Sequence, residues 1–326
     1  RGLDVPVTGK ASLRVSKSMS PDTVAVLPDA AKGLLPRLLV KEGDRVLCGS
    51  PVIADKKNPD ILLTAPVSGT VKQVVRGEKR KLLSVLIEAD DRQESVDFGT
   101  LDPAAASAQD VREALLKSGL WPVLVQRPYG ILADPAAEPK GIFVSPFHTA
   151  PLAADTEFTL GPKAATIQKG IDALARLAPV HVSLDATVKD SAFAKLENCT
   201  LHRFSGKHPA GNVGVQISHI SPIRKGEVVW TVSPLMLAEI GKLILTGKLD
   251  LTRKVAVTGP AAVKTGYVTA LPGTPVKDFT GTVAAEPRVI SGNVLTGESV
   301  GLDGYLGFFD DQITLLREGR EREWFG

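Results

Sequence analysis

The sequence predicts an α/β multidomain protein with a small β-sandwich first, an α/β domain second and a β-rich module last. Residues 33–77 alternate branched apolar residues with glycine turns, a pattern typical of paired strands. Residues 141–184 give the order strand, helix, strand that builds a mostly parallel sheet. After about residue 260, glycine and proline punctuate short β stretches. We therefore expect domains at residues 1–100, 101–260 and 261–326.

Length and composition indicate a soluble globular protein of two or three domains. The chain has 326 residues, of which 43% are hydrophobic and 23% charged. Its formal charge of +3, from 39 basic and 36 acidic residues, gives no electrostatic case for binding nucleic acid. A local basic patch is formed by Arg76, Lys79, Arg80 and Lys81.

Cysteine content and apolar runs restrict the cellular context. Cys48 and Cys199 are too few and too far apart for a disulfide framework, a metal site or an iron–sulfur cluster, which favours a reducing compartment. No apolar run approaches the roughly 18 to 20 residues of a membrane span, and no signal pattern opens the chain. Any membrane association is expected to be peripheral. Because the chain begins with Arg, we expect it to be a piece of a longer protein.

The sandwich is expected to hold two strand pairs joined by glycine corners. Turn pairs at Gly43, Gly49 and Gly69 are expected to supply the positive φ of tight hairpins. Residues 1–30, with an entry strand at 23–27, are expected to pack on the sandwich. The alternating apolar positions are Leu38, Val40, Val46, Val52, Val67, Val71 and Val74.

Local signals define the helices of the middle domain. One helix follows Pro103 and ends at Gly119, and another spans about 161–177. A third covers 235–246, where Ser233 can cap the first turn. The strands are expected at 141–145, 180–184, 200–204, 228–232, 254–258, 267–271 and 288–292.

Residues 40–46 and 65–71, with the sequences Val-Lys-Glu-Gly-Asp-Arg-Val and Ala-Pro-Val-Ser-Gly-Thr-Val, resemble the barrel-sandwich fold of biotinyl and lipoyl domains. Such domains carry their cofactor on a lysine in the hairpin between the two halves. Here that place is residues 55–59, and Lys57 would be the attachment point. An exposed turn on a sandwich kept as scaffold is the favoured interpretation, because Lys-Lys beside Asn-Pro is also an ordinary turn. A swinging-arm carrier is the alternative.

A glycine-rich loop at 205–214 suggests a phosphate cradle, with His208 as a candidate functional side chain. The loop matches neither the Walker pattern nor Gly-x-Gly-x-x-Gly, and no helix clearly follows it. A turn histidine bonded to backbone is therefore favoured over a catalytic base. His202, His208 and His219 lack the spacing of a metal site on one helix, so we expect no metal centre.

Taken together, stretches along nearly the whole chain resemble the NqrA family, the A subunits of the sodium-translocating NADH:quinone oxidoreductase. These stretches lie at residues 2–7, 40–44, 55–59, 64–69, 76–80, 118–121, 151–155, 208–211 and 288–292. The family is similar to the C subunit of the Rnf complex and to the FMN-binding subunit of respiratory complex I. The resemblance implies a barrel-sandwich hybrid module, a Rossmann-like α/β domain and a C-terminal β-grasp-like (SLBB-like) module that is truncated here.

The same resemblance implies a peripheral subunit on the cytoplasmic face of the bacterial inner membrane, assembled with the other subunits of the complex, including its membrane subunits. Flavin-binding relatives place a glycine-rich loop where this chain has residues 121–128. Here Pro122 and Pro128 remove amide donors, and bulky side chains block the approach of a phosphate. The cluster-ligating cysteines are also missing. We therefore expect neither FMN nor an iron–sulfur centre, and no catalysis by this chain alone.

The resemblance further implies that the protein helps to bind quinone, the substrate of the complex. A quinone needs apolar and aromatic walls and a donor for a carbonyl oxygen. Two connections supply these residue types, although packing between domains would equally explain Leu35 and Tyr129. The quinone-proximal candidates are Lys32, Gly33, Leu34, Leu35, Arg127 and Tyr129. The alternative function is a stand-alone carrier using Lys57, or a flavin-dependent oxidoreductase using the 206–214 loop.

Overall fold

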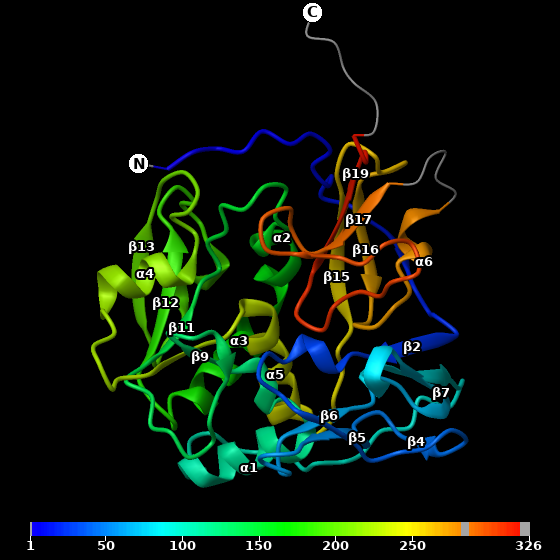
Figure 1. Cartoon of the computed structure of the whole chain (residues 1–326). Coiled ribbons are helices and arrows are strands. Elements are labelled where there is room, and N and C mark those ends of the chain that lie inside the picture. Colours follow the sequence, from blue (N-terminus) through cyan, green and yellow to red (C-terminus); the bar gives the residue numbers. More distant parts are fainter. Residues whose placement is uncertain (1, 282–286, 320–326) are drawn as a thin grey trace, which may run out of the picture.

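The computed structural model of the chain describes residues 2–281 and 287–319, and within these residues the strands form four sheets (Figure 1). Two small sheets make the N-terminal sandwich, drawn at the lower right of Figure 1. A parallel-centred sheet with its helices lies to the left, and a third β-rich module lies above the sandwich. Among the helices of these residues, none is long and apolar enough to cross a membrane.

The N-terminal sandwich confirms the predicted pairing of strands, with its core between the two sheets. Gly43 and Gly49 have φ of 89° and 94°, as predicted for the corners. The same prediction is wrong for Gly69, which begins a strand: a Cβ there would lie 1.9 Å from the carbonyl oxygen of Glu88, so close strand approach requires this glycine. The strands are β2 Thr23–Val26, β8 Leu82–Ala89, β7 Gly69–Arg76 and β4 Arg45–Val46 in one sheet, and β3 Pro36–Leu38, β5 Pro51–Asp55 and β6 Leu62–Thr64 in the other.

The middle domain has the sheet order β10-β9-β14-β11-β12-β13. Strands β11, β12, β13 and β14 are mutually parallel where they pair, which confirms the predicted strand–helix–strand unit, and β9 runs antiparallel beside β14. The strands are β9 Val125–Arg127, β10 Ile131–Leu132, β11 Ile142–Val144, β12 Val180–Asp185, β13 Thr200–Phe204 and β14 Val229–Thr231.

Helices begin and end largely where their capping residues predict. Ser233 Oγ accepts a hydrogen bond from the Met236 amide at 3.2 Å, and Gly247 closes the helix with φ of 67°. Two expectations from the sequence differ from the structure. The helix predicted for residues 161–177 is divided into η4 and α3, and helix α4 follows the glycine-rich loop, where no clear helix was predicted. The helices are α1 Ala108–Ser118, η3 Trp121–Val123, α2 Thr156–Leu160, η4 Gly161–Lys163, α3 Ala164–Leu174, η5 Ala192–Lys195, α4 Val213–Ile220 and α5 Pro234–Thr246.

Helices α3 and α5 cross closely because each carries a glycine at the contact. A Cβ added at Gly241 would lie 1.9 Å from the Thr166 carbonyl oxygen, and one at Gly170 would lie 2.4 Å from that of Leu237. Helix backbone cannot yield as a side chain can. The contact therefore depends on both glycines.

We expect Gly241→Ala to lower the free energy of unfolding by about 1–3 kcal/mol through overpacking. Gly214→Ala is the matched control, because nothing lies within 4 Å of a Cβ at this position in α4. The control should raise the free energy of unfolding by about 0.4–1 kcal/mol through the unfolded chain. Urea unfolding should show that the free energy of unfolding falls in Gly241→Ala and rises in Gly214→Ala. A change of the same sign in both variants would contradict the role assigned to the helix crossing.

The sheet of the third module has the order β1-β16-β15-β19-β17-β18 and includes a strand from the N-terminal segment. Strand β1 pairs in parallel with β16, so the expectation that all of residues 1–30 pack on the sandwich holds for β2 and is wrong for β1. Strand β15, which precedes residue 260, also belongs here. The bounds are β1 Val15–Ser18, β15 Arg253–Thr258, β16 Gly266–Ala270, β17 Arg288–Ser291, β18 Glu298–Ser299 and β19 Gln312–Leu316, and the short helix α6 Lys277–Thr280 packs in the same module. The short helices η1 Pro28–Ala30 and η2 Glu78–Arg80 lie in the N-terminal part of the chain.

The domain boundaries near residues 100 and 260 stay a prediction. Part of the expected module 261–326, namely residues 282–286 and 320–326, lies outside the described residues.

Buried charges lie where α5 meets the third sheet. Glu239 on α5 is 3% exposed and Arg253 on β15 is 1% exposed. Arg253 Nη1 donates to the Phe308 carbonyl oxygen at 2.6 Å and Nε to that of Leu251 at 3.2 Å. Glu239 Oε1 and Arg253 Nη2 have no hydrogen-bond partner among the described residues. Burial raises the pKa of Glu239 to about 7, although the positive charge of Arg253 opposes this shift.

Candidate functional site

A cavity of about 280 Å³ lies where the sandwich, the α/β domain and the third module meet. Its walls are mostly apolar, and two cationic side chains join them from distant parts of the sequence. The sandwich contributes the end of η1 and Lys32, the α/β domain contributes the β9–β10 hairpin, and the third module contributes one phenylalanine. The lining residues are Ala30, Ala31, Lys32, Pro122, Val125, Arg127, Gly130, Ile131, Leu132 and Phe309.

The β9–β10 hairpin and the connection after η1 form two facing walls of the cavity. Gly130 turns the hairpin with φ of 66°, which favours glycine. The amide of Leu132 donates to the Lys32 carbonyl oxygen at 2.8 Å, so backbone bonding joins the two walls. Gly33 has φ of 95°, and a Cβ there would lie 3.6 Å from Ile131 Cβ. The sequence at 32–33 thus seats the sandwich against the α/β domain.

Arg127 supplies the polar chemistry of the cavity. Its Nε is buried and has no hydrogen-bond partner among the described residues. A buried guanidinium N–H without an acceptor is costly unless a ligand or water accepts from it. Together with the apolar walls and the ring of Phe309, Arg127 can hold a small, flat, largely apolar molecule that presents an acceptor oxygen.

The structure brings together some of the sequence-predicted quinone residues and separates others. Lys32 and Arg127 line the cavity, and Gly33 lies beside it. Leu34 is 7% exposed and belongs to the sandwich core. Leu35 and Tyr129 are 45% and 82% exposed and do not line the cavity.

Apart from Lys32 and Arg127, none of the lining residues was among the quinone contacts predicted from sequence, and those missed include Pro122, Ile131 and Phe309. Phe309 lies some 180 positions from the β9–β10 hairpin in sequence, and no local signal links the two. Pro122 and Ile131 lie within a few positions of Arg127, so proximity in sequence was the available signal.

Residues 121–128, where the sequence comparison with flavin-binding relatives predicted the loss of a phosphate loop, contribute side chains to the core. Trp121 is fully buried, its Nε1 donates to the Ala133 carbonyl oxygen at 2.8 Å, and its ring meets Trp230 edge-on at 5.4 Å. The amides of Val123 and Leu124 donate within the η3 turn, both at 3.1 Å. These amides are therefore not directed at a ligand.

The glycine-rich loop at 205–214 is occupied by the chain's own N-terminal segment. The Leu3 amide donates to the His208 carbonyl oxygen at 2.9 Å, and Lys207 pairs with Asp4 at 2.9 Å. Thr149 Oγ1 lies 3.2 Å from His208 Nδ1 and accepts from the Gly211 amide at 3.0 Å. The His208 ring is thus bonded to a side chain, whereas the prediction had it bonded to backbone, and it is the His208 carbonyl oxygen that accepts from a backbone amide.

His202 instead meets a histidine that no sequence pattern singled out. Its Nε2 lies 3.1 Å from Nδ1 of His181, on the neighbouring strand. Within the described residues there is no group of three or more histidine, cysteine or carboxylate side chains placed to hold a metal ion.

Lys57 lies exposed in the hairpin between β5 and β6. The buried carboxylate of Asp55 organises this hairpin by accepting from the amides of Leu35, Lys57 and Asn58 at 2.7, 3.1 and 2.9 Å. Such bonding is what an Asx turn requires, with or without a modified lysine. The carrier alternative stays a prediction.

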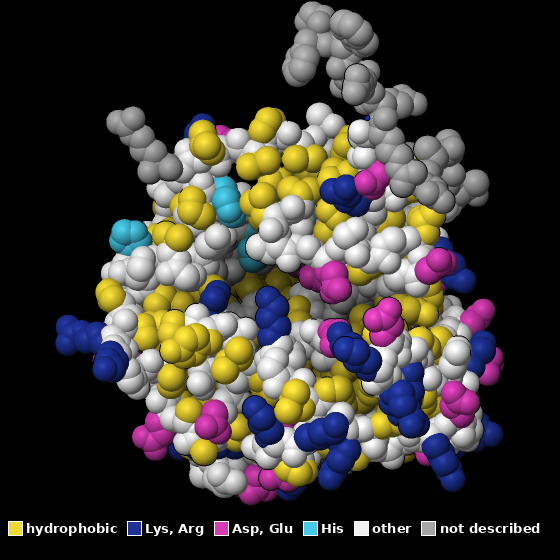
Figure 2. All heavy atoms as spheres, viewed as in Figure 1, with side chains coloured by type: hydrophobic (Ala, Val, Ile, Leu, Met, Phe, Trp, Pro, Cys, Tyr) yellow, Lys and Arg dark blue, Asp and Glu magenta, His cyan; other side chains and the backbone are white. Residues whose placement is uncertain are grey.

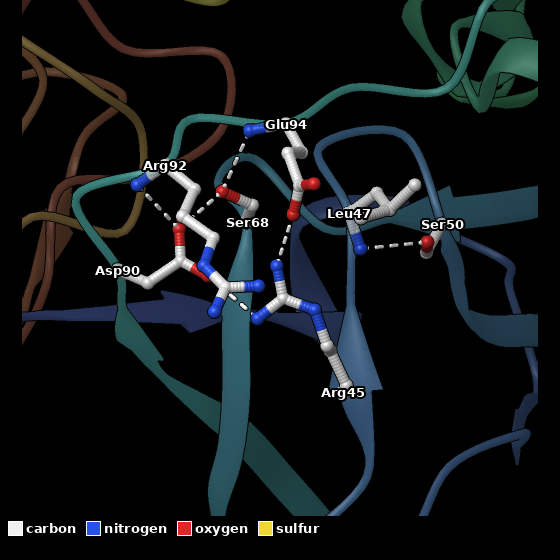
Figure 3. A network of polar contacts seen from close by, with 7 residues as sticks. All are labelled: Arg45, Leu47, Ser50, Ser68, Asp90, Arg92 and Glu94. Carbon is white, nitrogen blue, oxygen red and sulfur yellow. Dashed lines mark hydrogen bonds and ion pairs between the residues drawn. The ribbon is translucent and has the colours of Figure 1, made fainter.

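A polar network links β4 to the start of β7 and the end of β8 in the sandwich (Figure 3). Ser68 Oγ donates to Asp90 Oδ1 at 2.7 Å, and Arg45 donates to Asp90 Oδ2 at 2.8 Å and to Glu94. The hydrogen bond from Ser68, with help from Arg45, lowers the pKa of Asp90. The network borders a wider hollow of about 590 Å³, into which Cys48 also faces. Burial raises the pKa of the Cys48 thiol to about 11, so it is a neutral packing residue.

Comparison with known proteins covers nearly the whole chain. Family models match residues 1–90 as the NqrA N-terminal barrel-sandwich hybrid domain, 106–249 as the NqrA second alpha/beta domain and 254–301 as the NQRA C-terminal (SLBB) domain. These matches confirm the predicted fold class.

Curated relatives agree with the family models. The chain is 36% identical to the A subunit of the Na(+)-translocating NADH-quinone reductase of Neisseria meningitidis serogroup A, over 100% of this chain and 74% of the relative. It is also 36% identical to the proteins of the same name from Actinobacillus pleuropneumoniae, over 100% of this chain and 75% of the relative, and Pseudomonas aeruginosa, over 99% and 74%. The resemblance inferred from sequence is therefore confirmed, and the chain belongs to the NqrA family, the A subunits of the Na(+)-translocating NADH-quinone reductase.

Proposed function

We propose that this chain is a peripheral subunit of a sodium-pumping NADH:quinone oxidoreductase and that it helps to hold the quinone. The names of its relatives support membership of such a complex. Its partners are then the other subunits, including those in the membrane, and its place is the cytoplasmic face of the bacterial inner membrane. Electron transfer and sodium export belong to the complex as a whole.

The observation that carries the quinone role is the cavity at the junction of the three modules. A quinone headgroup is a flat apolar ring with two acceptor oxygens. Arg127 offers a guanidinium donor in the wall, Lys32 a second cation, and Phe309 a ring for stacking. Apolar walls with a few convergent donors are the usual composition of a small-molecule site.

We also propose that the chain binds no flavin and no iron–sulfur cluster. The buried Trp121 and the internally bonded amides of η3 support this, because they leave no phosphate nest in that segment. The absorbance spectrum and intact mass of the purified protein test it. A colourless protein of unmodified mass is expected, whereas a yellow preparation or an added mass on Lys57 would contradict it.

Arg127→Ala should lower kcat/KM for quinone in the assembled complex by about ten- to a hundredfold, the effect of losing a charged hydrogen-bond donor. Lys32→Ala should have a smaller effect, and Arg127→Lys should restore part of the activity. NADH oxidation with an artificial electron acceptor should be unchanged. Arg224→Ala, at an exposed arginine outside the cavity, is the matched control. Normal quinone kinetics in both Arg127→Ala and Lys32→Ala complexes would refute the site.

A further inference from the structure

Exposed apolar side chains line one edge of the sandwich beside the cavity. Leu35, Arg37 and Leu39 are two residues apart along the β3 region and all exposed, with Leu35 at 45% and Leu39 at 40%. Leu34, just before this row, belongs to the sandwich core, and Leu38, between Arg37 and Leu39, packs against it. Because strand side chains alternate, the exposed residues form one outward row. Among the described strands, β3 is at the edge of its sheet and pairs only with β5.

The β9–β10 hairpin continues this surface. Tyr129 is 82% exposed at the hairpin turn, and Ile131 is 40% exposed on β10. The Ile131 side chain lies against Gly33, which places it next to the start of the leucine row. The surface therefore carries both aliphatic side chains and a tyrosine around the mouth of the cavity.

Unpaired positive charges are mixed with these apolar groups. The cations of this face, named here the basic face, form no ion pair with any described residue. The Lys56 amide donates to the Leu35 carbonyl oxygen at 2.8 Å, which fixes the lysine pair beside the leucine row. The neighbouring carboxylate of Asp55 is buried and bonded to amides. The cations are Lys32, Arg37, Lys56, Lys57 and Arg127.

Figure 2 shows this mixture of chemistry over the lower half of the molecule, where Figure 1 draws β9, β6 and β5. Lys and Arg side chains stand there among hydrophobic ones, together with some Asp and Glu.

We propose that the basic face rests on an anionic lipid surface, with the mouth of the cavity turned toward the bilayer. Cations near such a surface are attracted by its negative potential. Leucine, isoleucine and tyrosine side chains gain by entering the headgroup region, where tyrosine keeps its hydroxyl hydrated. A nucleic acid would satisfy the cations and leave the leucine row in water. The inference goes beyond the proposed quinone role and does not require quinone in the cavity.

Sedimentation with vesicles tests the inference on the purified chain. The protein is incubated with vesicles of phosphatidylcholine alone or of equimolar phosphatidylcholine and phosphatidylglycerol, at low and at high salt. We expect binding to the anionic vesicles at low salt, and a residual part at high salt that comes from the apolar side chains.

Variants locate the contact. Lys56→Gln combined with Lys57→Gln should reduce the partition coefficient on anionic vesicles by roughly 30-fold, given the typical attraction of each cation. Lys189→Gln combined with Lys225→Gln removes two exposed lysines of the α/β domain and should leave binding unchanged. Tyr129→Ser should weaken the salt-resistant part by a few-fold. All positions are exposed, and thermal melts would verify that each variant folds.

Three outcomes would overturn the inference. They are no preference for anionic vesicles, equal losses in the two lysine pairs, and retention on a heparin column that depends on Lys56 and Lys57 while vesicles are not bound. The last would assign the face to another polyanion. None of these results involves quinone kinetics, so failure here is distinguishable from failure of the proposed function.

Discussion

Replacing Trp121 by alanine should lower the free energy of unfolding by about 3–5 kcal/mol, the range seen when large core side chains are truncated. Trp121 is fully buried, contacts Trp230 edge-on, and satisfies its indole N–H on the Ala133 carbonyl oxygen. Truncation removes this contact area and leaves a void beside Trp230. It also leaves the buried carbonyl oxygen of Ala133 without its indole donor.

Chemical denaturation followed by far-UV circular dichroism measures the loss. Trp121→Phe keeps most of the packing and gives up the hydrogen bond, so it should lose less than alanine. Tyr129→Ala, at an aromatic residue that is 82% exposed, should change stability by no more than about 0.5 kcal/mol. A loss below about 1 kcal/mol for Trp121→Ala would show that the segment is not a packed part of the core.

Glu239 should make stability depend on pH between about 4.5 and 7. Its pKa is raised from the ordinary 4.5 to about 7, first by burial, so the folded protein holds a proton that the unfolded chain releases. The stability gained from this proton is complete below pH 4.5 and is lost as the pH rises through 7. The folded protein then has to hold a buried carboxylate that Arg253 compensates only in part.

The wild type should therefore lose about 3 kcal/mol relative to Glu239→Gln between pH 4.5 and pH 8, from the size of the pKa change. Glutamine has the shape of the protonated acid and does not titrate. Urea unfolding of both proteins at matched pH values gives the difference directly, because all other groups titrate alike in the two. Parallel stability curves would mean that the pKa of Glu239 is the same in the folded and the unfolded protein.

Local features of the fold could be predicted from sequence because their causes are local. Ser233 and Gly247 define α5 through a side-chain acceptor and a left-handed residue, and both act within one helical turn. Gly69 shows the limit of this reasoning. A serine–glycine pair suggests a turn, yet the glycine is required by Glu88 on the neighbouring strand, which no local pattern indicates.

The candidate site was predictable only in its residue types. Lys32 and Arg127 offered donors within apolar connections, and the structure places both at one cavity. Leu34, predicted near the quinone, instead packs in the sandwich core, because side chains of extended backbone alternate in direction. Phe309 could not be found, since its approach depends on how the third module docks on the other two.

Strand β1 has a consequence for biosynthesis. It leaves the ribosome well before its partner β16, Gly266–Ala270, because the sandwich and the α/β domain lie between the two strands in the sequence. At usual rates of translation, β1 waits roughly 10–50 s for that partner. The nascent chain thus keeps β1 without its partner while the sandwich and the α/β domain fold, and synthesis of β16 then allows β1 to join the sheet of the third module.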